Sequence, residues 1–337
     1  MAQRQTTQRT AAGSGFGTTA ADLPTVADLH AAAERIGPYV HRTPVFTNSY
    51  LDAESGARLF FKAENLQKVG AFKMRGAANF VLQLSAAEAR RGVVTHSSGN
   101  HGQAVAAAAR ARGVPATVVM PRSSSAVKRA AVAGYGAHVV LCEDGDAARA
   151  AAAGRIEAEQ GATLIHPYGH PRIVAGQGTL ALELFEQVAA LDTVVAPVGG
   201  GGCLSGISVA ARARHPELAV YGAEPAAADD AARSLAAGHI IPVEQPDTVA
   251  DGLRTSLVQL TFALLRGNGV AILTVEEADI IAAMRLIWTR MKLVVEPSAA
   301  VTLAAVLAHP EPFRGRRVGL VLTGGNVDLD HLPWLQG

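Results

Sequence analysis

Two kinds of segment alternate along the chain. Short apolar runs bounded by turn residues predict strands at 57–64, 92–97, 115–121, 137–143, 163–168, 192–198, 218–225 and 317–322. Stretches with apolar residues at helical spacing predict helices at 73–84, 103–113, 123–136, 146–161, 178–188, 204–215, 276–291 and 297–309, and 226–275 is expected to be rich in loops. Strands that alternate with helices are typical of an α/β fold with parallel sheets flanked by helices on both faces.

Three polar or glycine-rich loops follow predicted strands. Their sequences are SSGNHG at 97–102, GGGG at 199–202 and TGGN at 323–326. Ligands of open α/β sheets bind beyond the carboxyl ends of the strands. We therefore expect the three loops to converge on one site.

The run Gly199, Gly200, Gly201, Gly202 lies between a predicted strand and a predicted helix. Glycines let backbone N–H groups approach an anion closely, and a helix N-terminus adds a positive dipole. The alternative is a tight turn without a ligand. Four consecutive glycines exceed what a turn requires, so the run predicts a phosphate site.

Lys73 lies in the segment GAFKMRG, flanked by Gly70 and Gly76. Only five of the 30 basic residues are lysines. A lysine amine can form an imine and a guanidinium cannot, so each lysine is a candidate for chemistry that arginine cannot perform. The alternative is an exposed lysine at a helix start. For Arg75 we favour a structural ion pair over a surface charge.

The bulk composition excludes several classes of protein. The net charge of +1 over 337 residues gives no footprint for nucleic acid or an anionic membrane, and 49% apolar residues can bury a large core. Two cysteines, Cys142 and Cys203, favour neither a disulfide framework nor a cysteine zinc site, and they fit the cytoplasm. Residues 1–22 lack an apolar run and are expected to form a disordered tail.

The polar loops leave alternatives open. Ser97 or Ser98 could cap a helix that starts near His101, which leaves Asn100 unexplained. Thr323 could hold a ring nitrogen or cap a turn.

Two other groups of polar residues have ordinary explanations beside the functional ones. Asn326 and Asp328 are expected to be turn residues. Glu224 and Asp230, with carbonyls between them, suit either a hard cation or a solvated acidic turn.

Eight segments in order resemble the fold-type II pyridoxal-phosphate enzymes, most closely the serine racemase and serine/threonine dehydratase group. They are KAENLQKVGAFKMRGA, THSSGNHGQA, IVAGQGTLALE, PVGGGGCLSG, AEPAAADD, VADGLRTS, RMKLVVEPSAA and LTGGNVD. The resemblance covers about residues 23 to 330. It implies a two-domain, tryptophan synthase β-like fold, with a large cofactor-binding domain at 23–85 and 165–337 and a small mobile domain at 86–164.

The resemblance also implies roles. Lys73 would carry pyridoxal phosphate and act as the base on the substrate Cα, and Ser98 would be the base on the opposite face in the racemase branch. The other expected cofactor contacts are Phe72, Asn100, Gly199, Gly200, Gly201, Gly202 and Thr323. The substrate would meet Ser97, Asn100, His101 and Arg149. A divalent cation such as Mg²⁺ would bind Glu224, Asp230 and the Ala228 carbonyl.

The expected activity is therefore elimination of water from a small β-hydroxy amino acid such as serine, threonine or 3-hydroxyaspartate, giving a 2-oxo acid and ammonia. The first alternative is a serine racemase with side dehydratase activity. A β-replacement synthase and a non-catalytic protein that binds pyridoxal phosphate are further alternatives. Members of the group are usually homodimers, which we also expect here, without a nucleic-acid or membrane partner.

Overall fold

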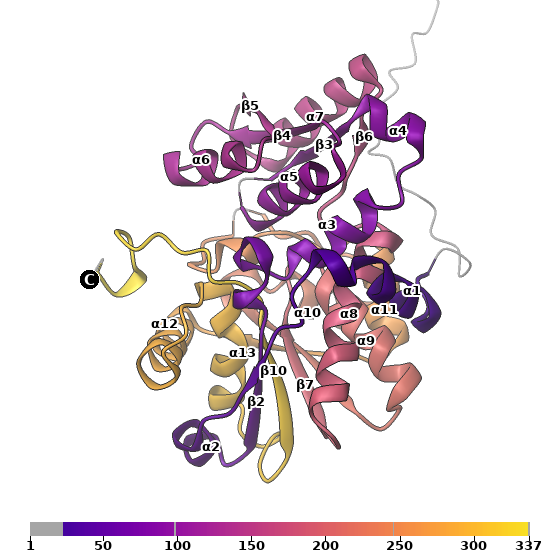
Figure 1. The fold of residues 1–337 in the computed structure, drawn as a ribbon. Helices are drawn as coiled ribbons and strands as arrows, with labels where there is room; N and C mark the ends of the chain where they lie inside the picture. Colours follow the sequence, from indigo (N-terminus) through magenta and orange to yellow (C-terminus); the bar gives the residue numbers. More distant parts are fainter. Residues whose placement is uncertain (1–22, 98, 245, 336–337) are drawn as a thin grey trace, which may run out of the picture.

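The computed structural model describes residues 23–97, 99–244 and 246–335, in two lobes that each contain one sheet (Figure 1). The expected tail at 1–22 and Ser98 lie outside the described residues. Among the described residues, no helix is both long and apolar enough to cross a membrane.

The large sheet has six strands in the order β1-β2-β10-β7-β8-β9. Every pair in it is parallel except β1 with β2 at the edge. The strands are β1 (Val45–Phe46), β2 (Arg58–Ala63), β7 (Thr193–Pro197), β8 (Ala219–Pro225), β9 (Ala271–Val275) and β10 (Arg317–Leu322).

Helices cover both faces of this sheet. One face packs against α1 (Val26–Ile36), α8 (Pro171–Gln187), α9 (Gly202–Arg214) and α11 (Gln259–Gly267). The other packs against α2 (Ser49–Ser55), α12 (Glu277–Leu286), a π-helical turn (Ile287–Met291) and α13 (Pro297–Ala308). The short helix α10 (Asp230–Ala237) follows β8.

The small sheet has four parallel strands in the order β5-β4-β3-β6. They are β3 (Val93–His96), β4 (Ala116–Pro121), β5 (His138–Cys142) and β6 (Thr163–Leu164). One face packs against α7 (Asp146–Gln160), and the other against α5 (Asn100–Arg112) and α6 (Ala126–Gly134). Helices α3 (Lys73–Val81) and α4 (Ala86–Arg91) precede β3. The mobility of residues 86–164 as a domain stays a prediction.

The structure corrects two of the sequence predictions. The segment 226–275 contains α10, α11 and β9 as well as loops, and the sequence pattern misses these elements because they are short or half exposed. Helix α8 begins at Pro171 instead of residue 178. Gly176 and Gly178 weakened the helical pattern there, although both lie inside the helix.

Close helix packing explains these two glycines. A Cβ at Gly176 would lie 2.7 Å from the Arg75 carbonyl oxygen on α3. A Cβ at Gly178 would lie 2.6 Å from Leu29 on α1 and 2.9 Å from the Gly206 carbonyl oxygen on α9. The glycines therefore let α8 approach three helices at once, which fixes α3 and its first residue, Lys73, against α8.

A buried ionic network anchors α3 through Arg75. The Arg75 guanidinium is fully buried and binds both Glu64 (Nε to Oε2, 2.7 Å) and Glu183 (Nη1 to Oε1, 2.7 Å). Lys62, also fully buried, binds the other oxygen of Glu183 at 2.6 Å. The expected structural ion pair of Arg75 is confirmed. Removing one member would leave buried charges without partners.

We predict that Arg75→Met lowers the free energy of unfolding by about 3–5 kcal/mol, because Glu64 and Glu183 lose their main partner inside the protein. Chemical denaturation of the cofactor-free chain measures this. Arg314→Met is the matched control, since Arg314 and Glu311 form an exposed pair at 3.5 Å, and it should change stability by less than about 0.5 kcal/mol. A loss below about 1 kcal/mol for Arg75→Met would show that the network is not an anchor.

Candidate active site

The end of β10 holds the segment that precedes Lys73. The Phe72 N–H donates to the Thr323 carbonyl (3.0 Å), and the Gly325 N–H donates to the Gly70 carbonyl (3.0 Å). Ala71 and Gly324 form an isolated antiparallel bridge between these bonds. Lys73 therefore starts α3 from a backbone that is fixed to the loop at 323–326.

The Lys73 amine points into the protein. Its Nζ donates to the Pro167 carbonyl at 3.0 Å and lies 5.1 Å from the centroid of the buried Phe72 ring. Burial lowers the pKa of Lys73 to about 8, against weaker opposing effects of Cys203 and Glu296. The neutral, nucleophilic amine is therefore accessible near neutral pH, as a lysine that forms an imine requires.

The loops at 97–102 and 323–326 meet, as predicted. Asn326 Nδ2 donates to Asn100 Oδ1 at 2.8 Å, and Asn100 Nδ2 donates to Glu296 Oε1 at 2.8 Å. Asn100 begins α5 in the small lobe, while Glu296 and Asn326 belong to the large lobe. Thr323 is buried directly before this junction.

The glycine loop joins the same region through Tyr168. A Cβ at Gly200 would lie 2.4 Å from the Tyr168 ring, and a Cβ at Gly202 would lie 2.8 Å from Tyr168 Cβ. Gly201 has a φ of +84°, which favours glycine, and a Cβ at Gly199 would approach Leu253 Cα at 3.0 Å. Packing alone therefore demands glycine along this run. The N-terminus of α9, at Gly202, still presents backbone N–H groups to an anion.

The His101 ring is bound to a backbone carbonyl, and the expected contact of His101 with the substrate stays a prediction. The ring is buried, and its Nε2 lies 3.2 Å from the Ile165 carbonyl, which accepts only, so Nε2 carries the proton. Nδ1 is buried without a hydrogen-bond partner. Burial and the charge of Lys73 lower the pKa of His101 well below its usual value. Donation to an anion would have to come from its backbone N–H in the first turn of α5.

The predicted serine cap of α5 is wrong for Ser97. The N-cap residue is Gly99, which makes no side-chain capping bond, and the Ser97 hydroxyl accepts a bond from the Gly99 N–H at 3.2 Å instead. The turn therefore leaves the first N–H groups of α5 for another acceptor. Ser98, the predicted second base, lies outside the described residues.

Arg149 on α7 faces a cluster of aromatic and imidazole side chains. Burial lowers the pKa of His96, and the positive charge of Arg149 lowers it further. Burial raises the pKa of Tyr168, and the charge of Arg149 opposes this rise. Burial also lowers the pKa of Arg149 itself. His166 lies between these two rings, 6.3 Å from the His96 centroid and 4.7 Å from the Tyr168 centroid.

The hydrogen bonds of His166 define its tautomer. Its Nδ1 accepts from the Gly169 N–H at 2.7 Å and from the Tyr168 N–H at 3.3 Å, so the ring proton lies on Nε2. Burial lowers the pKa of His166 to about 4, and the ring is therefore a neutral donor at pH 7. Sequence reasoning gave neither Tyr168 nor His166 a role, because both follow β6 without a recognisable motif.

The acidic pair after β8 is buried rather than solvated. Glu224 accepts from the N–H groups of Ala232 (2.8 Å) and Ala231 (3.3 Å), and Asp230 Oδ2 accepts from Leu257 N–H (3.3 Å). Asp230 Oδ1 is buried without a hydrogen-bond partner. Burial raises the pKa of Glu224 to about 8 and that of Asp230 to about 6.

A bound cation would supply a partner for the Asp230 oxygen that has no hydrogen bond. Among the described residues, no group of three His, Cys, Asp or Glu side chains could hold a metal, so a site here would also need carbonyl oxygens such as that of Ala228. The unpaired oxygen of Asp230 fits such a cation.

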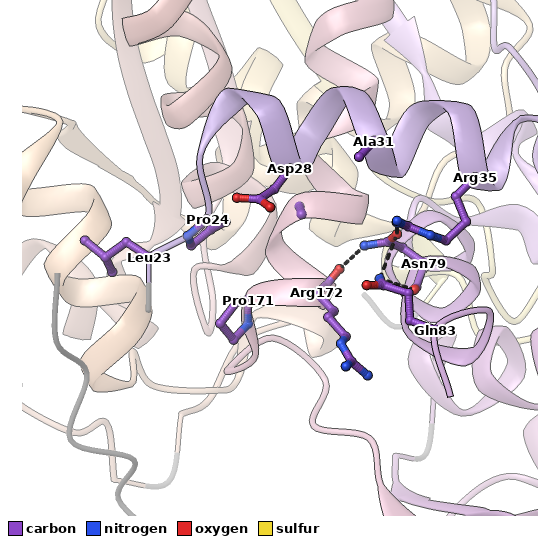
Figure 2. A pocket seen from close by; sticks show the side chains of 10 residues that line it. Leu23, Pro24, Asp28, Ala31, Arg35, Asn79, Gln83, Pro171 and Arg172 are labelled. Carbon is purple, nitrogen blue, oxygen red and sulfur yellow. Dashed lines mark hydrogen bonds between the residues drawn. The ribbon is translucent and has the colours of Figure 1, made fainter. Parts of the chain in front are cut away.

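A separate cavity of about 220 Å³ lies between α1, α3 and α8 (Figure 2). Its polar side chains bind one another: Arg35 donates to Asn79 Oδ1 at 2.5 Å, and Asn79 Nδ2 donates to the Arg172 carbonyl at 2.6 Å. None of the predicted site residues lines this cavity. This cavity is therefore separate from the predicted site.

Known proteins are similar to this chain over most of its length. Residues 36–324 match the family described as "Pyridoxal-phosphate dependent enzyme". The chain is 50% identical to the beta-hydroxyaspartate dehydratase of Paracoccus denitrificans (strain Pd 1222), over 93% of this chain and 99% of that protein. It is 46% identical to the serine racemase of Arabidopsis thaliana, over 93% and 95%. The structure of maize serine racemase superposes with a TM-score of 0.90 at 42% identity, covering 93% of this chain and 96% of that one.

We predict that pyridoxal phosphate attaches to the cofactor-free chain at a rate that rises with pH, with a midpoint near 8 rather than near 10.5. The reason is that only the neutral amine attacks an aldehyde, and burial makes Lys73 neutral above that pH. Stopped-flow absorbance measures the rate, and Lys73→Ala should give no visible band. A midpoint at the value of an exposed lysine would contradict the buried position of the amine.

Proposed function

Because the chain belongs to the pyridoxal-phosphate dependent enzyme family, we propose that it eliminates water from a β-hydroxy amino acid and releases a 2-oxo acid and ammonia. We propose further that its preferred substrate carries a second carboxylate, as 3-hydroxyaspartate does. The observation that carries this proposal is the neutral Nε2–H donor of His166, 6.3 Å from the His96 ring and 4.7 Å from the Tyr168 ring, two groups on which the charge of Arg149 acts.

The residues present fit pyridoxal phosphate. The buried Lys73 amine can bind its aldehyde, and the first turn of α9 with the glycine loop can take its phosphate. The Asn100 amino group can donate to its ring oxygen, and Thr323 lies at the end of β10 for its ring nitrogen. When bound, the cofactor withdraws electrons from the substrate Cα, so that a proton can leave this carbon.

The chain's own groups then divide the remaining work. Lys73, with a pKa near 8, can accept the Cα proton and return it. The N–H groups in the first turn of α5, at Asn100 and His101, can bind the α-carboxylate. Arg149 and the neutral Nε2–H donor of His166 can bind a second carboxylate.

The name of the Paracoccus relative supports this choice of substrate, since that protein is a beta-hydroxyaspartate dehydratase at 50% identity. The second candidate function is racemisation of serine. It is supported by the Arabidopsis relative and by the serine at position 98. Chiral analysis of serine recovered after incubation separates the two, because a pure dehydratase produces no D-serine.

We predict that oxo acid release is fastest with 3-hydroxyaspartate in a panel that also contains serine and threonine. Arg149→Met should lower kcat/KM for 3-hydroxyaspartate by about 10- to 100-fold, the effect of losing a charged hydrogen bond. It should lower kcat/KM for serine less, because serine has no second carboxylate. Arg155→Met, an exposed arginine on the same helix, is the matched control and should act like the wild type.

Equal losses on serine and 3-hydroxyaspartate would show that Arg149 does not select the second carboxylate. No release of oxo acid from any member of the panel would contradict the proposed elimination itself.

We also propose that Glu224, Asp230 and the Ala228 carbonyl bind a divalent cation such as Mg²⁺. The support is the buried pair of carboxyl groups with one oxygen lacking a partner. A cation would offset the cost of burying these two groups in their charged form.

We predict that Mg²⁺ raises the thermal midpoint of the enzyme and that EDTA reverses the rise. Saturation at 100 times the dissociation constant would add about 2.7 kcal/mol of stability. Asp230→Asn should abolish the response. Asp229→Asn should preserve it, because Asp229 forms an exposed pair with Arg233. An unchanged response in Asp230→Asn would place the cation elsewhere.

The homodimer and the cytoplasmic location also stay predictions. Exposed apolar side chains at Phe46, Tyr50, Leu66 and Val294 are consistent with a contact between two copies of the chain. Light scattering of the purified chain measures the mass directly, and a monomer mass would contradict the dimer.

A further inference from the structure

Asn326 is more than the turn residue that the sequence indicated. Its Nδ2 lies 2.8 Å from the Val69 carbonyl oxygen and 2.8 Å from Asn100 Oδ1. Val69 precedes Gly70 on the segment that leads to Lys73, and Asn100 begins α5 in the small lobe. One side-chain amide therefore connects the lysine segment to the other lobe.

The chemistry of these partners determines the direction of each hydrogen bond. A backbone carbonyl only accepts, so the Asn326 atom that faces Val69 must be the amino group. The same amino group faces Asn100, so the Asn100 atom there must be the carbonyl oxygen. The Asn100 amino group is therefore left to face Glu296, whose Oε1 accepts it at 2.8 Å.

Glu296 is buried and belongs to the same hydrogen-bond network. It is 5% exposed, and its backbone N–H donates to the Gly324 carbonyl at 3.0 Å. Burial raises the pKa of its carboxyl group to about 8, against weaker opposing effects of Asn100 and the Asn326 backbone. A Cβ at Gly324 would lie 2.5 Å from Glu296 Oε1 and 3.1 Å from Asn100 Nδ2. The glycines of the loop at 323–326 thus make room for this contact.

The backbone beside this chain of bonds is in an uncommon conformation. Val69 has a φ of +60°, which is costly for a β-branched residue, by about 1–3 kcal/mol. The Asn326 bond to the Val69 carbonyl and the Gly325 bond to the Gly70 carbonyl hold it there. Such strain is typical of backbone that is held in place for a functional site.

We propose that Glu296 and Asn326 are positioning residues that fix the Asn100 amide in one orientation, with its amino group presented to the ring oxygen of the cofactor. One N–H of this amino group donates to Glu296. The other N–H would donate to the ring oxygen of the cofactor. The inference rests on the role of Asn100 in the proposed function. Neither Glu296 nor Asn326 touches the cofactor in this account; both act through Asn100.

The test reverses the direction of the bonds. Asn326→Asp places an acceptor where the donor was, so the Asn100 amino group turns toward residue 326 and its carbonyl oxygen turns toward Glu296. Burial raises the pKa of Glu296 to about 8, so the variants are compared above this pH, where the Glu296 carboxylate repels that oxygen. Adding Glu296→Gln relieves this repulsion. The glutamine amino group then donates to Asn100, and its carbonyl oxygen still accepts from the backbone N–H of residue 326.

The double variant therefore has satisfied hydrogen bonds around a reversed Asn100 amide, while the Val69 carbonyl loses its donor in both the single and the double variant. We expect the thermal midpoint of its cofactor-free form to recover relative to Asn326→Asp alone. We expect its dissociation constant for pyridoxal phosphate to stay about 10-fold or more above the wild type, because a carbonyl oxygen now faces the ring oxygen. The visible absorbance band of the bound cofactor should change with it.

Recovery of both the thermal midpoint and the cofactor affinity in the double variant would overturn the proposal, since the three residues would then be structural only. An unchanged affinity in both variants would overturn it as well. A wild-type protein that binds the cofactor but releases no oxo acid would contradict the proposed function, while this comparison of affinities would still decide the orientation of Asn100.

A second pair of variants tests the proposal if Asn326→Asp does not fold. In Asn326→Leu, Glu296 alone still selects the amino group of Asn100, so cofactor affinity should stay within about threefold of the wild type. In Asn326→Leu combined with Glu296→Gln, the reversed amide is favoured, and affinity should fall by about 10-fold. Equal affinities in these two variants would contradict the proposal.

Discussion

The site depends on a half-buried lysine amine that loses much of its hydration. An exposed lysine is protonated at neutral pH and cannot attack an aldehyde, whereas burial lowers the pKa of Lys73 to about 8. This burial requires that α3 be held by several contacts. The ionic network of Arg75 holds it from below, the glycines of α8 allow close packing beside it, and the end of β10 holds the segment before it.

The second requirement is that the two lobes meet at this amine. Asn100 belongs to the small lobe, yet its side-chain bonds go to Glu296 and Asn326 of the large lobe. Lys128 and Asp251 form another contact between the lobes, at 2.7 Å. The same bonds that join the lobes therefore also orient the Asn100 amide.

The sequence predicts most of the fold because strands and helices alternate, and parallel sheets place the ends of their strands at one edge. That rule groups the loops after β7 and β10 of the large sheet, whereas the contact between 97–102 and 323–326 depends on how the two lobes pack together. It cannot predict the direction of the bonds between Asn100, Asn326 and Glu296, because three segments distant in the chain contribute to them. Asn326 looked like a turn residue since asparagine after two glycines is common in turns.

The sequence pattern also fails where packing overrides local preference. Gly176 and Gly178 weaken a helical pattern, but inside α8 they allow contact with neighbouring helices. Ser97 looked like a helix cap, but its hydroxyl binds the Gly99 N–H in the turn before α5. The roles that depend on bound groups, such as those of Thr323 and the glycine loop, follow from family resemblance and from fit, and they stay predictions until the bound groups are observed.

The central claim is that pyridoxal phosphate binds covalently to Lys73. Borohydride reduction of the enzyme, followed by digestion and peptide mass spectrometry, tests it most directly, because reduction makes the bond between cofactor and lysine permanent. The account predicts a pyridoxyl adduct on the peptide that contains Lys73. An adduct on Lys62, Lys68, Lys128 or Lys292 instead, or no adduct on a protein that is yellow before reduction, would contradict it.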